Sequence, residues 1–457
     1  MKQVCLLIIF FFVGTNGFAQ FGEQITITEE SSSTWSVFLA DLDGDLNLDL
    51  LATDATLEGK ISWFKNLDGQ GTFGEEQIIT LNLTETRFVT AADLDGDNDM
   101  DVLATSLFGD LVVWYENVDG LGTFGTQHII TTQVDLPLMA FVVDIDNDND
   151  LDVLTASKND GKLAWYKNEN GMGTFGSQQI ISLTQSAASV FVADIDGDGD
   201  GDVITDRSSN GFPCWFENLD GLGTFGPEQE ITQDTTGSHY VIADDLDGDN
   251  DMDILNLEFG GDTVSWFENL DGQGNFSSKK IITTDVSGPR LVVTADIDND
   301  GDMDVIYNSQ EGVTDNKVAW QENDGEGNFG PQQIITTNVV AARGLFSADI
   351  DNDSDMDVFY SSIGDNKIAW QENLTVLGLN DNLEKYFSIT PNPAKGIIKI
   401  ESEYSINELK IYNILGELIL KDSNPTNQLD ISNLSTGLLF VQIETDKGSF
   451  VKKVIKE

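Results

Sequence analysis

Short apolar runs alternate with polar turns along most of the chain. In residues 88–131 the runs read FVTAA, VLAT, LVVWY and HIIT, and Gly, Asn and Asp residues separate them. β-branched and aromatic residues dominate these runs and none has a sustained helical period, so each run predicts a β-strand. Four short strands in a unit of about fifty residues are typical of one blade of a β-propeller.

The same unit recurs seven times. The last copy stops at residues 370–373 and lacks a fourth strand, whereas residues 21–28 (FGEQITIT) match the fourth strand at residues 124–131 (FGTQHIIT). We therefore predict that the first strand of the mature chain completes the last blade and closes a seven-bladed ring without free sheet edges. The third strand of each unit carries one tryptophan at the same point: Trp63, Trp114, Trp165, Trp215, Trp266, Trp320 and Trp370.

These tryptophans have two interpretations. Core packing between blades is the first, because both faces of each blade are buried in a propeller. A ring of sugar-stacking platforms is the second. Trp35 lies outside the repeated position and is the better candidate for an exposed aromatic side chain.

Each unit also contains the nine-residue pattern Asp-x-Asp-x-Asp-x-x-x-Asp between its first two strands. The seven copies recur every 50 to 53 residues, and all 28 template positions are Asp. So many carboxylates within nine residues repel one another unless a cation lies among them. Side chains at positions 1, 3, 5 and 9 and the carbonyl of position 7 can supply the oxygens that Ca²⁺ prefers, so up to seven Ca²⁺ ions are expected.

Position 4 of every loop is Gly or Asn, the residue types that best tolerate the positive φ of a tight turn. An EF-hand is excluded because position 12 is never Glu and the flanking segments are β-type. Magnesium fits less well, and zinc is disfavoured because no Cys or His lies in any loop. The candidate metal ligands are Asp41, Asp43, Asp45, Asn47 and Asp49; Asp93, Asp95, Asp97, Asp99 and Asp101; Asp144, Asp146, Asp148, Asp150 and Asp152; Asp194, Asp196, Asp198, Asp200 and Asp202; Asp245, Asp247, Asp249, Asp251 and Asp253; Asp296, Asp298, Asp300, Asp302 and Asp304; and Asp349, Asp351, Asp353, Asp355 and Asp357.

The net charge and the N-terminal segment exclude several classes of partner and location. The net charge is −56, and residues 20–379 hold 13 basic against 68 acidic side chains, which disfavours nucleic acid and anionic membranes as partners. Residues 1–19 have the basic start, apolar centre and small-residue end of a secretory signal peptide, so no membrane span is expected after its removal. The mature chain then keeps one thiol, Cys214, which we interpret as a buried apolar residue.

The repeats resemble FG-GAP/VCBS repeats, on the evidence of units such as residues 194–202 (DIDGDGDGD) followed by Phe225-Gly226. This resemblance covers residues 21–373 and implies the calcium-bearing seven-bladed propeller of integrin α subunits and some fungal lectins. It implies little about function, because members of the family bind proteins, bind sugars or accompany enzymes.

The composition changes after residue 373, where the Asp loops stop. Residues 386–457 contain short strands divided by turns and predict a small β-sandwich. The segments at residues 391–393 (PNP), 410–416 (KIYNILG) and 434–440 (LSTGLLF), with the closing Lys452-Lys453, are similar to the type IX secretion sorting domain of Bacteroidetes. We therefore expect an all-β protein with four segments: signal peptide 1–19, propeller 20–373, linker 374–385 and sorting domain 386–457. The similarity of the last segment implies that the protein is secreted or attached to the outer-membrane surface and that the type IX secretion machinery is a partner.

Three functions remain open at this point. The first is a binding or adhesion module for carbohydrate or a surface or matrix protein, the second a polysaccharide lyase or hydrolase on a propeller, and the third a purely structural surface component. No nucleophile or phosphate-loop motif favours an enzyme, and His128 and His239 read as packed or surface residues. A few basic and aromatic residues lie at similar positions shortly before the Asp loops of their units: Arg87, His239-Tyr240, Arg290 and Arg343. Their spacing is consistent with an anion site at the axial end of the first strands, and equally with ordinary surface arginines.

Overall fold

The computed structural model describes residues 20–374, apart from 184–186, 208–210 and 311–314, and residues 387–456, apart from 403–405, 413–417, 423–427, 435–436 and 446–447. The predicted signal peptide and nearly all of the predicted linker lie outside the described residues. The chain divides into two compact units, Met1–Thr375 and Val376–Glu457. The domain boundaries drawn from the sequence stay predictions.

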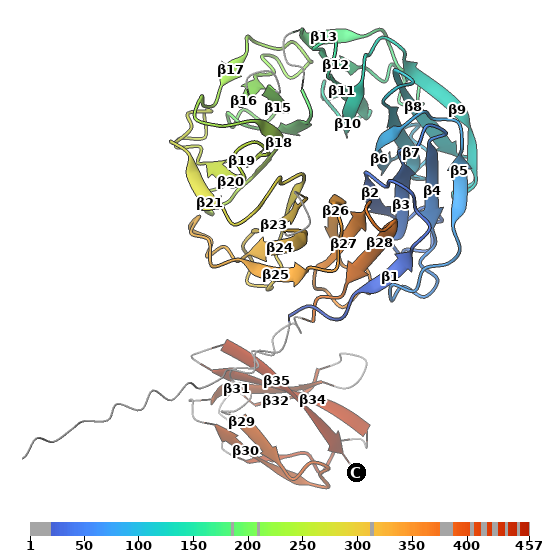
Figure 1. The fold of residues 1–457 in the computed structure, drawn as a ribbon. Helices are drawn as coiled ribbons and strands as arrows, with labels where there is room; N and C mark the ends of the chain where they lie inside the picture. The colour runs from blue at the N-terminus through green and yellow to red at the C-terminus, as the bar shows by residue number, and fades with distance from the viewer. Residues whose placement is uncertain are drawn as a thin grey trace, which may run out of the picture. The chain divides into compact units, whose positions relative to one another are not determined.

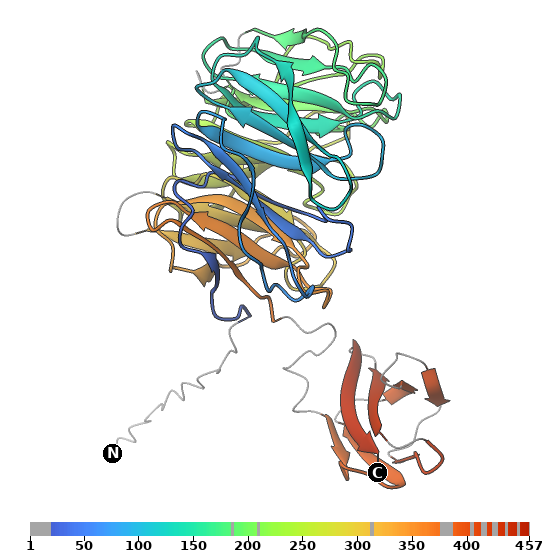
Figure 2. The ribbon, with the colours of Figure 1, turned by 90° about the vertical axis from the view of Figure 1, so that its right-hand side faces the viewer.

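The first unit is a ring of seven antiparallel four-stranded sheets, which confirms the predicted propeller (Figure 1). The side view in Figure 2 shows how strongly the individual sheets twist. The first three blades are β2 (Val37–Ala40), β3 (Asp49–Asp54), β4 (Lys60–Phe64) and β5 (Gln77–Thr80); β6 (Thr86–Ala92), β7 (Asp101–Ser106), β8 (Leu111–Asn117) and β9 (Phe124–Thr131); and β10 (Pro137–Val143), β11 (Asp152–Ser157), β12 (Leu163–Tyr166) and β13 (Gln179–Ser182).

The next three blades follow the same order from the axis outward. They are β14 (Val190–Ala193), β15 (Asp202–Arg207), β16 (Phe212–Phe216) and β17 (Gln229–Glu230); β18 (Ser238–Asp244), β19 (Asp253–Glu258), β20 (Thr263–Phe267) and β21 (Lys280–Thr283); and β22 (Val292–Ala295), β23 (Asp304–Ser309), β24 (Lys317–Gln321) and β25 (Gln333–Thr336).

The seventh blade joins the two ends of the propeller sequence. Its inner strands are β26 (Ala342–Ala348), β27 (Asp357–Ser362) and β28 (Lys367–Gln371), and its outer strand is β1 (Ile25–Thr28), which precedes the first blade in the sequence. Ile25 pairs with Trp370, and the Gly22 N–H donates to the Glu372 carbonyl at 2.8 Å. In Figure 1, β1 lies beside β28 at the point where the ring closes.

Apolar packing between neighbouring sheets holds the ring together. Six of the seven second strands are buried at every residue, and the seventh, β15, is buried at all but Arg207. A strand covered on both faces consists mainly of apolar residues, which explains runs such as VLAT. The seven repeat tryptophans are 1–3% exposed, so the core interpretation is right and the sugar-platform interpretation is wrong.

The second unit has two small antiparallel sheets. One consists of β29 (Phe387–Thr390), β30 (Ile397–Ser402) and β33 (Gln428–Asp430), and the other of β31 (Ile406–Tyr412), β32 (Leu418–Asp422), β34 (Gly437–Thr445) and β35 (Gly448–Lys456). Side chains from both sheets, including Ile398, Leu409 and Val441, share one buried cluster. This is the predicted small β-sandwich.

Candidate metal centres

The seven Asp loops occupy equivalent places in the ring, each between the first and second strand of its blade. Position 9 of each loop is the first residue of the second strand and is fully buried: Asp49, Asp101, Asp152, Asp202, Asp253, Asp304 and Asp357. The strand thereby fixes one end of each loop, and the turn that follows the first strand fixes the other.

Hydrogen bonds to the position-1 carboxylate wrap each loop into a tight turn. In the first loop, Asp41 Oδ1 accepts from the N–H groups of Gly44 and Asp45 at 2.8 and 3.1 Å, and Oδ2 accepts from Leu46 at 2.9 Å. Position 4 has φ between 57° and 78° in all seven loops, as its Gly and Asn residues predict. Position 6 is also left-handed in every loop, including Leu46 and Ser354, which the sequence analysis missed.

The position-9 carboxylates accept backbone hydrogen bonds on both oxygens. Asp101 Oδ2 accepts from Leu94 N–H at 2.9 Å, and its Oδ1 accepts from Asn117 N–H at 2.9 Å. Burial, offset in part by these bonds and reinforced by the neighbouring carboxylates, raises the pKa of Asp101 to about 7. The other six position-9 aspartates have the same raised pKa of about 7, so burial makes ionisation of this carboxylate costly in every loop.

The position-3 carboxylate is the strongest indication of a cation site. Its Oδ1 atom is buried and has no hydrogen-bond partner in any loop: Asp43, Asp95, Asp146, Asp196, Asp247, Asp298 and Asp351. In each of the first five loops, carboxylate oxygens of positions 1, 3 and 9, or of positions 1, 3 and 5, lie within 4.8 Å of one another. An unpartnered buried acceptor repeated seven times, in an all-oxygen donor set, fits a hard divalent cation.

The repeats themselves decide the family. The FG-GAP-like repeat model matches residues 47–104, 93–155, 144–205, 245–307 and 308–360, which together span more than half of the chain. The chain belongs to the FG-GAP-like repeat family. The secretion system C-terminal sorting domain model matches residues 388–457, so the chain carries a type IX sorting tail and is secreted or attached to the cell surface.

Solved structures share the fold of the FG-GAP-like ring at low sequence identity. One is a lectin from Agrocybe aegerita described as specifically recognising non-reducing terminal N-acetylglucosamine, with a TM-score of 0.50 and 21% identity over 72% of this chain and 86% of the lectin. Another is BBS1N in complex with ARL6DN, with a TM-score of 0.53 and 11% identity over 78% of this chain and 97% of that one. No curated protein sequence matches the chain. Within the described residues, no helix is long and apolar enough to cross a membrane.

A buried asparagine links each FG-GAP-like loop to the loop of the preceding blade. Asn117 N–H donates to Asp101 in its own blade, and Asn117 Nδ2 donates to the Leu42 carbonyl of the previous loop at 2.9 Å. The same two bonds recur around the ring for Asn66, Asn117, Asn168, Asn218, Asn269, Asn323 and Asn373. This role was not predicted from the sequence, although every unit contains Asn three residues after its tryptophan.

The glycine-rich turn after each third strand is also explained by the neighbouring blade. A Cβ at Gly122 would lie 2.4 Å from the Trp63 ring, and one at Gly173 would lie 2.3 Å from the Trp114 ring. The turn backbone therefore packs directly on the tryptophan of the preceding blade. These turns are hairpins that join the third and fourth strands of a blade, and none of them leads into a helix as a nucleotide-binding loop would.

In two of the seven loops a lysine ammonium group contacts the carboxylates. The residue before the linking asparagine is Glu in five blades and Lys in two, Lys65 and Lys167. Lys65 Nζ contacts Asp43 and lies 2.9 Å from Asp45, and Lys167 Nζ contacts Asp146 and lies 2.7 Å from Asp148. In the other five blades burial, followed by neighbouring carboxylates that include Glu116, Glu217, Glu268, Glu322 or Glu372, raises the pKa of the position-3 aspartate.

The other residues singled out in the sequence are a cysteine, two histidines, an aromatic residue and three arginines, and most of them are packed against neighbouring side chains. Cys214 is fully buried in β16, and burial raises the pKa of its thiol to about 12, so it is the inert apolar residue that the sequence predicted. His128 stacks on Trp114 with ring centroids 4.6 Å apart. Trp35 is half-buried beneath arginine side chains. Arg87, Arg290, Arg343 and His239 lie together at the axis.

Proposed function

We propose that this exported propeller is a binding module that calcium holds in shape and whose ligand is carbohydrate or matrix. The observation that carries the proposal is the position-3 carboxylate oxygen, which is buried and unpartnered in all seven loops. Side chains at positions 1, 3, 5 and 9 and the carbonyl of position 7 would hold the ion. Bound calcium supplies positive charge that offsets the repulsion between the carboxylates of each loop.

The two lysine-containing loops should bind calcium more weakly than the five glutamate-containing loops. The Lys65 ammonium already contacts the position-3 and position-5 carboxylates, so an ion has to displace it. We expect isothermal titration of the chelated protein to show five tighter sites, with the other two about tenfold weaker or unfilled. The variant Lys65→Glu should add a sixth tight site.

A lysine on the outside of the same blade provides the control for this titration. Lys60 pairs with Glu76 at 2.6 Å and touches no loop carboxylate, so Lys60→Gln should leave the count unchanged. Seven equivalent sites in the unaltered protein, or an unchanged count in Lys65→Glu, would show that the ammonium does not compete.

Carbohydrate is the first ligand class to test. The Agrocybe aegerita lectin of similar fold is described as recognising N-acetylglucosamine, and a surface-displayed module meets polysaccharide outside the cell. A glycan array probed with the protein in millimolar calcium should show selective binding that chelator abolishes. Absence of binding to every glycan in calcium, with a folded protein, would remove carbohydrate as the ligand and leave matrix protein.

One observation favours the enzymatic alternative. His239 lies next to Arg290, with 3.1 Å between Nε2 and Nη1, and burial together with the nearby cations lowers the pKa of His239 to about 4. A neutral imidazole can accept a proton, and the guanidinium beside it can bind a carboxylate, which are two roles that a uronate lyase uses. If the protein is a polysaccharide lyase, incubation with a uronate polymer will release unsaturated, ultraviolet-absorbing ends; a polymer of unchanged length excludes it.

A further inference from the structure

Each blade has one residue at the start of its inner strand, at the end of the ring axis opposite the Asp loops. This residue lies six positions before the first Asp of the loop. In blade order these residues are Trp35, Arg87, Leu138, Ala188, His239, Arg290 and Arg343. Because adjacent blades are neighbours in the closed ring, the charged and aromatic members form one continuous arc from His239 through Arg290, Arg343 and Trp35 to Arg87.

The side chains of this axial arc contact one another across the blades. The guanidinium carbons of Arg87 and Arg343 lie 3.5 and 4.2 Å from the ring centroid of Trp35. Arg290 lies over Phe259 at 4.1 Å, contacts His239, and donates through Nε to Gln310 Oε1 at 2.5 Å. Aromatic faces thus hold the guanidinium groups close to one another.

The arc has more positive charge than its surroundings neutralise. Glu85 pairs with Arg87, but among the ion pairs of the described residues neither Arg290 nor Arg343 has a carboxylate partner. Arg343 is 8% exposed, and its Nε and Nη1 atoms are buried without a hydrogen-bond partner. Burial, followed by the charges of Arg290 and Arg87, lowers the pKa of Arg343 to about 9.

This concentration of positive charge is unusual for the chain. Acidic residues outnumber basic ones by 79 to 23, yet three of the four arginines gather at one point, and within the described part of the chain two of these have no carboxylate in an ion pair. The fourth, Arg207, is paired with Glu228. Unpartnered, buried guanidinium N–H groups are costly, and an oxyanion that accepts from them removes that cost.

We propose that the axial arc binds the carboxylate or sulfate group of an acidic polysaccharide. The guanidinium fork matches two oxygens of such a group, and neighbouring guanidinium groups can contact successive acidic sugars. Only the assignment of the anion to a polysaccharide rests on the proposed function; the oxyanion site follows from the arc alone. An acidic peptide presents the same charge and is the competing ligand in the test.

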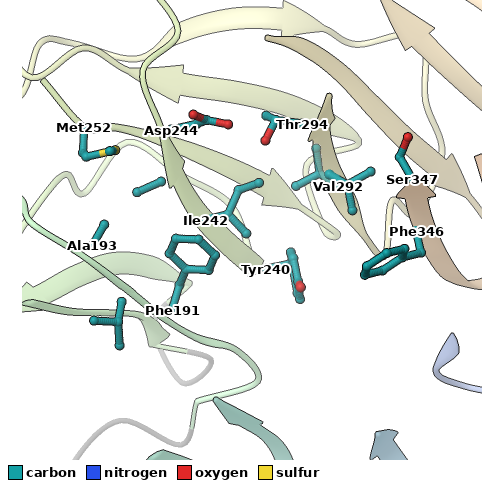
Figure 3. A pocket seen from close by; sticks show the side chains of 13 residues that line it. Phe191, Ala193, Tyr240, Ile242, Asp244, Met252, Val292, Thr294, Phe346 and Ser347 are labelled. Carbon is teal, nitrogen blue, oxygen red and sulfur yellow. The ribbon is translucent and has the colours of Figure 1, made fainter. Parts of the chain in front are cut away.

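The inner channel explains why the anion binds at the arc and not deeper along the axis. A cavity of about 490 Å³ there is lined mainly by apolar side chains, among them Phe191, Tyr240 and Phe346 (Figure 3). Its polar lining includes Asp244, which repels anions. Apolar walls offer an acidic sugar no hydrogen bonds, so the favourable contacts are confined to the arc.

Calorimetry with dextran sulfate, a short glucuronate oligosaccharide, neutral dextran and poly-glutamate tests the proposal, with calcium held constant. The variants are Arg290→Gln and Arg343→Gln, and the matched control is Arg207→Gln, which removes a paired arginine of β15. We expect dextran sulfate or glucuronate to bind the unaltered protein and the control, about tenfold weaker binding to each arc variant, and no binding of neutral dextran. Melting temperatures in calcium establish that the variants are folded, and the half-buried Arg290 provides a second site if Arg343→Gln does not fold.

Three results would overturn the inference. Equal binding by the arc variants and the control would place the anion elsewhere. Equal binding of neutral dextran would remove the acidic group as the determinant, while leaving the proposed carbohydrate function intact. Tight, arc-dependent binding of poly-glutamate without binding of either acidic saccharide would refute the acidic polysaccharide as the ligand of the arc, whereas the carbohydrate function itself is refuted only by a glycan array without any binding.

Discussion

Removing calcium is expected to lower the melting temperature of the propeller markedly and to reverse the direction in which its stability depends on pH. Each filled loop adds RT ln(1 + [L]/Kd) to the free energy of unfolding. With dissociation constants of about 10⁻⁴–10⁻³ M, typical of extracellular calcium modules, about 1 mM calcium contributes roughly 0.4–1.4 kcal/mol per site. Five to seven filled loops together account for several kcal/mol, a large part of the stability of a folded domain.

The pH reversal follows from the buried position-9 aspartates. Without the ion, the pKa of Asp101 and of its six counterparts is about 7 in the folded state, against 3.8 for the unperturbed side chain. Between these values the folded protein binds more protons than the unfolded chain, so the stability of the calcium-free protein rises as the pH falls from about 8 to 5. With calcium bound the carboxylates are held ionised, so acid competes with the ion and stability falls over the same range.

Melting curves at several pH values, with calcium and with chelator, measure both effects. Magnesium at equal concentration controls for ionic strength and for general divalent binding. The variant Asp101→Asn should lower the calcium stoichiometry by one and leave the other loops filled. A melting temperature indifferent to chelator, or stability that falls with acid in both conditions, would refute the calcium assignment.

Deleting residues 21–28 is expected to open the ring. The segment contains β1, whose residues pair with β28, and Phe21, which is 7% exposed and bridges to Asn373. Its removal exposes the hydrogen-bonding edge of β28 and the apolar surface under Phe21, so we expect a loss of about 3 kcal/mol or more in the free energy of unfolding. An exposed strand edge also promotes association between chains.

Thermal melts and light scattering of the deletion variant measure this result. A synthetic peptide of residues 20–30 added in trans should restore part of the melting temperature, because it can pair with the vacant edge. The variant Ile25→Thr changes a side chain that is 39% exposed and keeps the strand, so it should behave like the unaltered protein. An unchanged melt without added scattering in the deletion variant would show that β1 does not close the ring.

Features that depend on neighbours in the chain were predictable from the sequence. The Asp template, the Gly or Asn at position 4 and the four apolar runs of each unit are local, since short-range hydrogen bonds and strand alternation determine them. The displaced strand at residues 21–28 was also recognisable, because it repeats a segment whose usual place was missing from the last unit. Together these patterns determined the blade count, the closure and the candidate metal ligands.

Only the tertiary structure decided what lies between blades. Asn117 has to reach the Leu42 carbonyl 75 residues away, and Gly122 has to pack on Trp63, which no local pattern specifies. In the sequence Lys65 is a lysine at the end of a strand, and only the fold shows that it contacts the Asp43 carboxylate. The axial arginines were separated by 50 residues or more, and the ring gathered them into one arc because each inner strand begins at the same end of the axis. The chain determines each blade through short-range interactions, whereas its binding sites arise from the closed ring, in which residues distant in sequence become neighbours.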